Sequence, residues 1–230
     1  GHETEGNPAC GFGGPMITRV AGFGVLLSLT LGQSGCSSSS PDPGAKPESA
    51  NRPELTNVYQ VGPVVDLLAL VDPQRDSVLG EFRREEGSLI IPAVRSAQLN
   101  LGVELPEQYE LFLDVARTRG NESLNLGISV GGHPAVVVIE GWGNRTSGLN
   151  RVDGRLGQDN ETSSQFPVFK DASPQSIRII VRRESVLVDV NGNVFIDFRG
   201  DPSRLSFDDR YFQRPEPDQL LLGGWETEFR

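Results

Sequence analysis

The segment Ser185-Val-Leu-Val-Asp-Val-Asn-Gly-Asn-Val-Phe-Ile-Asp-Phe198 contains two short apolar runs separated by Asn191-Gly192. Both runs have some period-two character, as in strands with one buried face. Asn and Gly tolerate the positive φ that a type I′ turn requires at its two central positions. The segment therefore predicts a β-hairpin with strands at Ser185–Val190 and Val194–Phe198.

Similar runs extend outward from this hairpin over most of the chain, broken by Gly, Pro, Asn and Asp. They are Ser88–Ile91, Ala97–Leu101, Tyr109–Ala116, Ser123–Val130, Ala135–Glu140, Ser176–Arg182 and Gln219–Gly223. Val65–Leu70 fits either one turn of helix or a first strand. Because neither an amphipathic helix nor a βαβ alternation is evident, we predict an all-β, two-sheet sandwich.

Residues 16–36 have the three-part layout of a secretory signal. Arg19 precedes the apolar run Val20–Leu31, and Ser34-Gly35 then leads to Cys36. The run is too short to span a roughly 30 Å hydrocarbon layer as a helix. The end of the segment resembles the bacterial lipobox, although Gln33 stands where that motif has an aliphatic residue. The resemblance implies lipidation of Cys36, whereas the alternative is a buried core helix that ends in cysteine.

These features predict a division of the chain into four parts. Residues 1–15 precede the first methionine and are a non-native leader, 16–35 are the signal peptide, and 36–63 are the lipid-anchored cysteine with a polar linker. The Ser- and Pro-rich linker cannot bury a core. Residues 64–230 are the sandwich, which we expect to lack its last strand, the alternative being a short native terminus. The expected location is the cell envelope, facing the periplasm or the cell surface.

Charge and cysteine content exclude several classes of function. The formal net charge is −10 and the isoelectric point about 4.7, which argues against nucleic-acid binding. Cys10 and Cys36 both precede the domain, so no disulfide framework is expected. His133 is the single histidine of the domain, which excludes a Cys/His zinc site and a Cys-His nucleophile.

The order of several short motifs resembles the concanavalin A-like, or laminin G-like, jelly-roll domains that are abundant in planctomycete secreted proteins and related to keto-disaccharide hydrolase-type domains. The motifs are Val65–Leu68, Asp72–Phe82, Gly87–Ile90, Ser147–Leu149, Val152–Gly154, Asp159–Thr162, Val188–Gly192, Arg199–Asp201 and Leu220–Gly223. Together they span about residues 64–229. The resemblance implies a jelly-roll sandwich whose concave face often binds glycans, but it implies no particular activity.

Two tryptophans are the candidates for ligand contact. Trp142 lies between glycines in Glu140-Gly-Trp-Gly-Asn144-Arg145, and Trp225 follows Gly223-Gly224. An exposed indole can stack on a sugar ring, with Glu140, Asn144 and Arg145 as hydrogen-bonding neighbours. The alternative is that each indole caps the hydrophobic core.

A polar loop carries a candidate metal site, Asp159-Asn160-Glu161, whose oxygen atoms suit Ca²⁺ but lack EF-hand spacing. A solvated loop is the simpler interpretation, and no cofactor is otherwise expected.

The sequence predicts a membrane-tethered, non-catalytic module that binds a glycan or a cell-envelope protein. One alternative is a glycoside hydrolase, which needs two carboxylates beside the scissile bond. No Glu-x-Asp-x-x-Glu strand is present, and Glu140 is the single carboxylate on a predicted strand near an aromatic residue. A second alternative is a structural envelope protein with no ligand, which would have no pocket.

Overall fold

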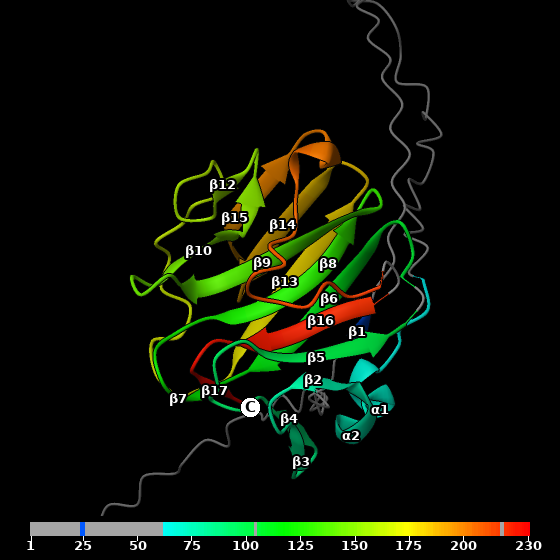
Figure 1. Cartoon of the computed structure of the whole chain (residues 1–230), viewed down its shortest axis with the longest axis vertical. Helices are drawn as coiled ribbons and strands as arrows, with labels where there is room; N and C mark the ends of the chain where they lie inside the picture. Colours follow the sequence, from blue (N-terminus) through cyan, green and yellow to red (C-terminus); the bar gives the residue numbers. More distant parts are fainter. Residues whose placement is uncertain (1–23, 26–61, 104, 217–218) are drawn as a thin grey trace, which may run out of the picture.

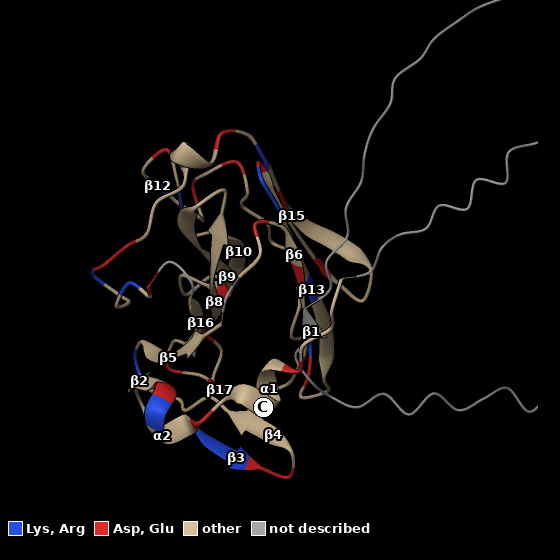
Figure 2. Cartoon of the chain, turned by 90° about the vertical axis from the view of Figure 1, so that its right-hand side faces the viewer, with Lys and Arg blue, Asp and Glu red and all other residues tan. Residues whose placement is uncertain are grey.

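A computed structural model describes residues 24–25, 62–103, 105–216 and 219–230 of the chain. These residues form two antiparallel sheets that lie face to face (Figure 1; Figure 2). The predicted two-sheet jelly-roll sandwich is therefore confirmed. The predicted leader, most of the predicted linker and lipidation at Cys36 fall on residues outside these ranges. Of the predicted signal peptide only Gly24–Val25 lies within them, paired with Phe112 and Leu111 of the five-stranded sheet. In the described ranges, no helix has the length and apolar character needed to cross a bilayer.

One sheet has five strands in the order β1-β6-β13-β14-β15, and the other has six in the order β10-β9-β8-β16-β5-β2. The first comprises β1 (Gly24–Val25), β6 (Tyr109–Val115), β13 (Gln175–Arg182), β14 (Ser185–Val190) and β15 (Asn193–Arg199). The second comprises β10 (Thr146–Leu149), β9 (His133–Gly141), β8 (Leu124–Val130), β16 (Gln219–Gly224), β5 (Ala97–Gly102) and β2 (Ser77–Leu79).

Shorter elements complete the described chain. They are β3 (Arg83–Glu85) with β4 (Ser88–Ile90), β7 (Arg117–Arg119) with β17 (Glu228–Phe229), β11 (Arg151–Val152) with β12 (Arg155–Leu156), the helices α1 (Leu67–Leu70) and α2 (Pro73–Asp76), and a 3₁₀ turn at Pro202–Arg204. The ambiguous run from Val65 to Leu70 thus contains one turn of helix. It begins after Asp66, whose carboxylate accepts a hydrogen bond from the Ala69 N–H, as an N-cap residue does.

The hairpin that decided the fold has the predicted turn. Val190 pairs with Asn193, so the loop contains Asn191 and Gly192 alone. Their φ angles are 50° and 82°, as a type I′ turn requires. Close to the turn, the pairing of β14 with β15 is interrupted by a bulge between Val188 and Asp189. This bulge shifts the register of the two strands.

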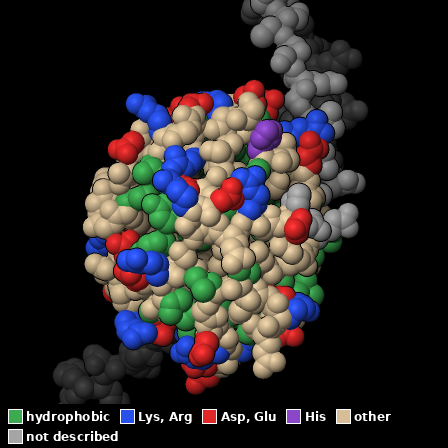
Figure 3. Space-filling view, viewed as in Figure 1, with side chains coloured by type: hydrophobic (Ala, Val, Ile, Leu, Met, Phe, Trp, Pro, Cys, Tyr) green, Lys and Arg blue, Asp and Glu red, His purple; other side chains and the backbone are tan. Residues whose placement is uncertain are grey.

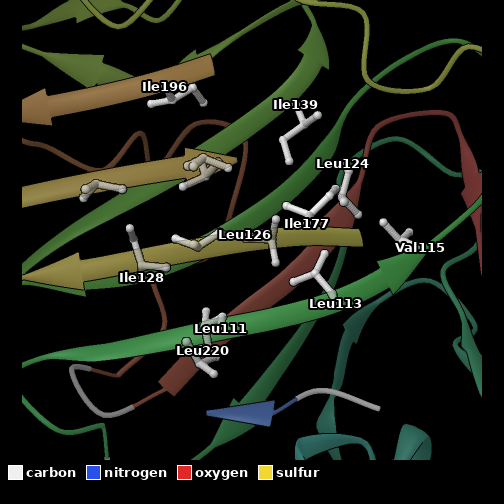
Figure 4. Close-up of a cluster of buried hydrophobic side chains, with 14 of the residues drawn as sticks. Leu111, Leu113, Val115, Leu124, Leu126, Ile128, Ile139, Ile177, Ile196 and Leu220 are labelled. Carbon is white, nitrogen blue, oxygen red and sulfur yellow. The ribbon is translucent and has the colours of Figure 1, made fainter. Parts of the chain in front are cut away.

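The core lies between the two sheets because alternate side chains point inward. Leu111, Leu113 and Val115 of β6 are buried against Leu124, Leu126 and Ile128 of β8 (Figure 4). The intervening residues of each strand face outward. The outward side chains of the five-stranded sheet include ion pairs, such as Arg182 with Glu110 at 2.6 Å.

Candidate functional site

The outer face of the six-stranded sheet carries polar and apolar side chains side by side. Asn125 of β8 stands directly opposite Val138 of β9 in the strand register, and both point away from the core. Val136, Val138 and Leu221 on this face form a second, smaller hydrophobic cluster. Figure 3 views the same face, where hydrophobic side chains gather toward the left among charged ones.

A pocket of about 280 Å³ opens on this face, and we call it the tryptophan pocket. Its aromatic lining residues are Trp142, Tyr211, Phe212 and Trp225. Its other lining residues are Glu122, Ser123, Asn125, Val138, Gly143, Asn150 and Leu156. The structure thus brings the two predicted tryptophans, which are far apart in the sequence, into one pocket.

The Trp142 indole is held by a strained turn between β9 and β10. Trp142 has a φ of 57°, a left-handed conformation that is a genuine outlier for a bulky residue and costs about 1–3 kcal/mol. The next residue, Gly143, donates its N–H to Glu122 Oε2 at 3.4 Å. The indole also lies directly over Gly157, where an added Cβ would be 2.3 Å from Trp142 Cη2. Only glycine at position 157 permits this ring position.

The Trp225 indole is fixed from two sides. The Tyr211 ring meets it edge-on, with centroids 5.7 Å apart and an interplanar angle of 79°. The Arg95 guanidinium lies 5.4 Å from the centroid of the indole ring. The Trp225 N–H donates to the Ser123 carbonyl at 3.0 Å, which ties the residue to the strand that carries Asn125. These contacts fix the position of the indole ring.

Residues 206–216, which we call the strap, cross the outer face of the six-stranded sheet and supply Tyr211 and Phe212 to the pocket (Figure 1). Gln98 of β5 clamps the strap: its Oε1 accepts from the Gln213 N–H at 2.9 Å, and its Nε2 donates to the Gln213 carbonyl at 2.7 Å. Phe207 and Phe212 pack into the smaller hydrophobic cluster. The strap is therefore part of the sheet surface.

Asp208 anchors the strap through two arginines. Its Oδ2 accepts from Arg151 Nη2 at 2.7 Å and from Arg210 Nη2 at 2.8 Å. The hydrogen bonds from Arg210 and then from Arg151 hold the pKa of Asp208 well below its usual range, although burial acts in the opposite direction. A lowered pKa in the folded protein means that this stabilisation is complete above the unfolded value of about 3.9 and is lost as the pH falls through the folded value.

Replacing Asp208 by asparagine is expected to lower the free energy of unfolding by about 1–3 kcal/mol at pH 7, because hydrogen bonds to charged partners are lost. The difference from the wild type should be constant above about pH 4 and shrink at lower pH. Urea unfolding at several pH values measures it. Asp209→Asn is the matched control, because Asp209 and Arg214 form an exposed pair of little value. An equal effect of the two substitutions would contradict the anchoring role.

The predicted role of Glu140 in ligand contact needs correction. The Glu140 side chain is 0% exposed. Its Oε2 accepts from Arg117 Nη1 at 2.8 Å and Arg145 Nε at 3.2 Å, and its Oε1 accepts from the N–H groups of Val168 and Phe169 at 2.7 and 2.9 Å. Glu140 is thus a structural residue that joins β9 to the loop before β13.

The other two polar neighbours of Trp142 also lie outside the tryptophan pocket. Arg145 donates to Glu140 and to the Phe169 carbonyl. Asn144 is exposed and accepts through Oδ1 from the Thr146 N–H at 3.2 Å. Neither side chain lines the tryptophan pocket, and both make hydrogen bonds within the turn, so their contact with a ligand beside Trp142 stays a prediction.

The three residues of the candidate calcium site have different partners. Glu161 pairs with Arg204 at 3.0 Å, and Asp159 accepts from Gln158 Nε2. Asn160 is buried and donates through Nδ2 to the Leu149 carbonyl at 2.9 Å. In the part of the chain that the structure describes, no group of three His, Cys, Asp or Glu residues is arranged to hold a metal ion. Asn160 therefore packs the loop against β10, while Asp159 and Glu161 stay at the surface.

Sequence reasoning missed every lining residue of the pocket except the two tryptophans, and four of the missed residues matter most for its chemistry. The sequence offered a weak indication that Asn125 and Asn150 belong to a site, because each is a polar residue next to buried strand positions. It offered no such indication for Glu122 and Tyr211, because their loops reach the pocket only through the fold.

No protein-family model matches the chain, and no curated protein matches it. Several solved structures are similar in fold. Sheep galectin-11 in complex with glycerol has a TM-score of 0.34 and 15% identity, covering 57% of this chain and 92% of its own. The Emp47p carbohydrate recognition domain has a TM-score of 0.38 and 13% identity, covering 65% and 82%. A putative glycosyl hydrolase from Parabacteroides distasonis has a TM-score of 0.39 and 14% identity, covering 70% and 96%. At these TM-scores, nothing about a ligand or an activity follows for this chain.

Proposed function

We propose that the domain binds carbohydrate, with one sugar ring held in the tryptophan pocket. The observation that carries the proposal is that Trp142 and Trp225 line the same pocket with Tyr211. A sugar ring has apolar C–H faces and polar edges. Aromatic walls suit the faces, and a few polar groups such as Asn125 and Asn150 suit the edges. Both amides belong to the lining.

The chemistry of the pocket favours binding without catalysis. Hydrolysis of a glycosidic bond uses a pair of carboxylates that flank it. Glu122 is the single carboxylate among the described residues that line the pocket. A structural protein with no ligand is the less favoured alternative, because it needs no pocket with aromatic walls.

The wider setting in the proposal is the cell envelope. Residues 16–36 support export and a lipid anchor at Cys36, and the Ser- and Pro-rich residues after it support a flexible tether. A glycan-binding domain on such a tether would reach ligands near the membrane surface. Labelling of the expressed protein with a fatty-acid analogue, compared with Cys36→Ser, tests the anchor independently of ligand binding.

A glycan array probed with the purified protein tests the binding function. We expect selective binding, accompanied by a change in tryptophan fluorescence. Gly157→Ala should weaken the binding about tenfold, because the added Cβ must displace the Trp142 ring. Gly102→Ala is the control, since Gly102 has no positive φ and the nearest atom to an added Cβ there, Gln219 Nε2, lies 4.0 Å away. No binding to any glycan, or an equal loss in both variants, would contradict the proposal.

A further inference from the structure

Two buried amide nitrogens in the tryptophan pocket have no hydrogen-bond partner within the described chain. They are Asn125 Nδ2 and Asn150 Nδ2, and these residues are 1% and 4% exposed. In the described ranges, Ser77 Oγ is the one other buried side-chain N or O atom that has no hydrogen-bond partner. An unsatisfied buried donor costs about 1–3 kcal/mol, and most such groups in native proteins have a partner. Two of them lining one pocket indicate a ligand that supplies an acceptor.

The two amides approach the pocket from either side of β9. Asn125 lies on β8 opposite Val138, and Asn150 follows β10, where its N–H donates to the Val136 carbonyl at 2.8 Å. The side chains of Val138 and Phe212 line the same pocket and belong to the apolar cluster on this face. The site therefore offers hydrogen-bond donors next to an apolar surface.

We propose, on the basis of the carbohydrate-binding function above, that the pocket recognises the acetamido group of an N-acetylhexosamine. The acetamido carbonyl oxygen accepts from the Asn125 and Asn150 amides once these side chains turn toward the ligand, because each Nδ2 is covered in the unbound domain. The acetamido methyl group packs against Val138 and Phe212. The sugar ring then meets the indoles. A hydroxyl group in that place would satisfy an amide but would leave the apolar surface without a partner, and its own O–H would need an acceptor.

Charge and size restrict the ligand further. Glu122 lines the pocket, and no Lys or Arg does so among the described residues. An anionic sugar is therefore disfavoured by the carboxylate, whereas a neutral acetamido sugar can donate its N–H or a hydroxyl to it. The volume of about 280 Å³ lies just below the usual range for ligand pockets and fits one sugar residue, so any further residue of a glycan would lie outside the pocket.

The test compares two disaccharides that differ only in the acetamido groups, N,N′-diacetylchitobiose and cellobiose, by calorimetry and tryptophan fluorescence. We expect the acetylated sugar to bind at least tenfold more tightly. A site that hydrogen-bonds a particular group discriminates against analogues that lack it. Asn125→Asp and Asn150→Asp replace a donor with an acceptor of the same shape, so each should remove most of this preference.

Asn100→Asp is the matched control. Asn100 lies on β5 of the same six-stranded sheet but outside the pocket. Its Oδ1 accepts a hydrogen bond from Gln98, which an aspartate would still permit.

Equal affinity for the two disaccharides would overturn the acetamido inference while leaving carbohydrate binding intact. A lack of binding to any glycan would overturn both. Tighter binding of tetramethylammonium than of either sugar would also overturn both, because aromatic walls with one carboxylate can hold such a cation. If either aspartate variant fails to fold, the affinities of the wild-type protein for the two disaccharides alone test the acetamido inference.

Discussion

Replacing Glu140 by glutamine is expected to lower the free energy of unfolding by about 3–5 kcal/mol, the usual cost of breaking a buried ion pair from one side. Glutamine keeps the shape of the side chain but removes its charge. The Arg117 guanidinium, 9% exposed and 2.8 Å from the Glu140 carboxylate, would then be buried without a counter-charge. The Val168 and Phe169 N–H groups would also share a weaker acceptor. Urea unfolding measures the change.

An exposed ion pair provides the control for this experiment. Glu107 and Arg183 lie 2.8 Å apart, but their side chains are 54% and 69% exposed. Such pairs contribute about 0–1 kcal/mol, so Glu107→Gln should leave stability almost unchanged. A similar small effect for Glu140→Gln would mean that the carboxylate does not join β9 to the loop before β13, and its assignment as a structural residue would fail.

Removing both indoles, in the double variant Trp142→Ala with Trp225→Ala, is expected to weaken glycan binding by more than about a hundredfold. Truncation of a central aromatic contact costs about 2 kcal/mol or more, and each 1.4 kcal/mol is a factor of ten. Titration of the best ligand from the array, followed by calorimetry because the variant lacks tryptophan fluorescence, measures the loss.

The control for the double variant keeps the pocket walls in place. Tyr211→Phe retains the ring that meets Trp225 edge-on and removes only a hydroxyl, so affinity should change by less than about threefold. Trp142 also packs against the smaller hydrophobic cluster, so unfolding by urea must first establish that the double variant is folded. A folded double variant with wild-type affinity would place the ligand elsewhere on the protein.

Local sequence was sufficient wherever neighbouring residues decide the conformation. Alternating side chains predicted the strands on both sides of Asn191-Gly192, and the observed positive φ angles at that turn follow from the two residue types. Flanking glycines likewise drew attention to Trp142 and Trp225, which both line the pocket.

Glu140 illustrates where local reasoning failed. Strict alternation along β9 would place it on the outer face with Val136 and Val138, beside Trp142. Its φ of 55° interrupts the extended backbone, so the period of two ends before it. Its carboxylate contacts Val168 and Phe169 instead. Nothing in the residue types around position 140 announces this change of direction.

The sequence by itself determined that this chain forms strands and where its clearest hairpin turns, and it singled out two tryptophans as candidates for stacking. Only the tertiary structure decided that these indoles share one pocket with Tyr211, Asn125 and Asn150. The physical reason is that strand direction and turn type are local properties of the backbone. The neighbours of a strand are set by packing across the sheet: the order β9-β8-β16 brings the turn after β9 next to the residues after β16.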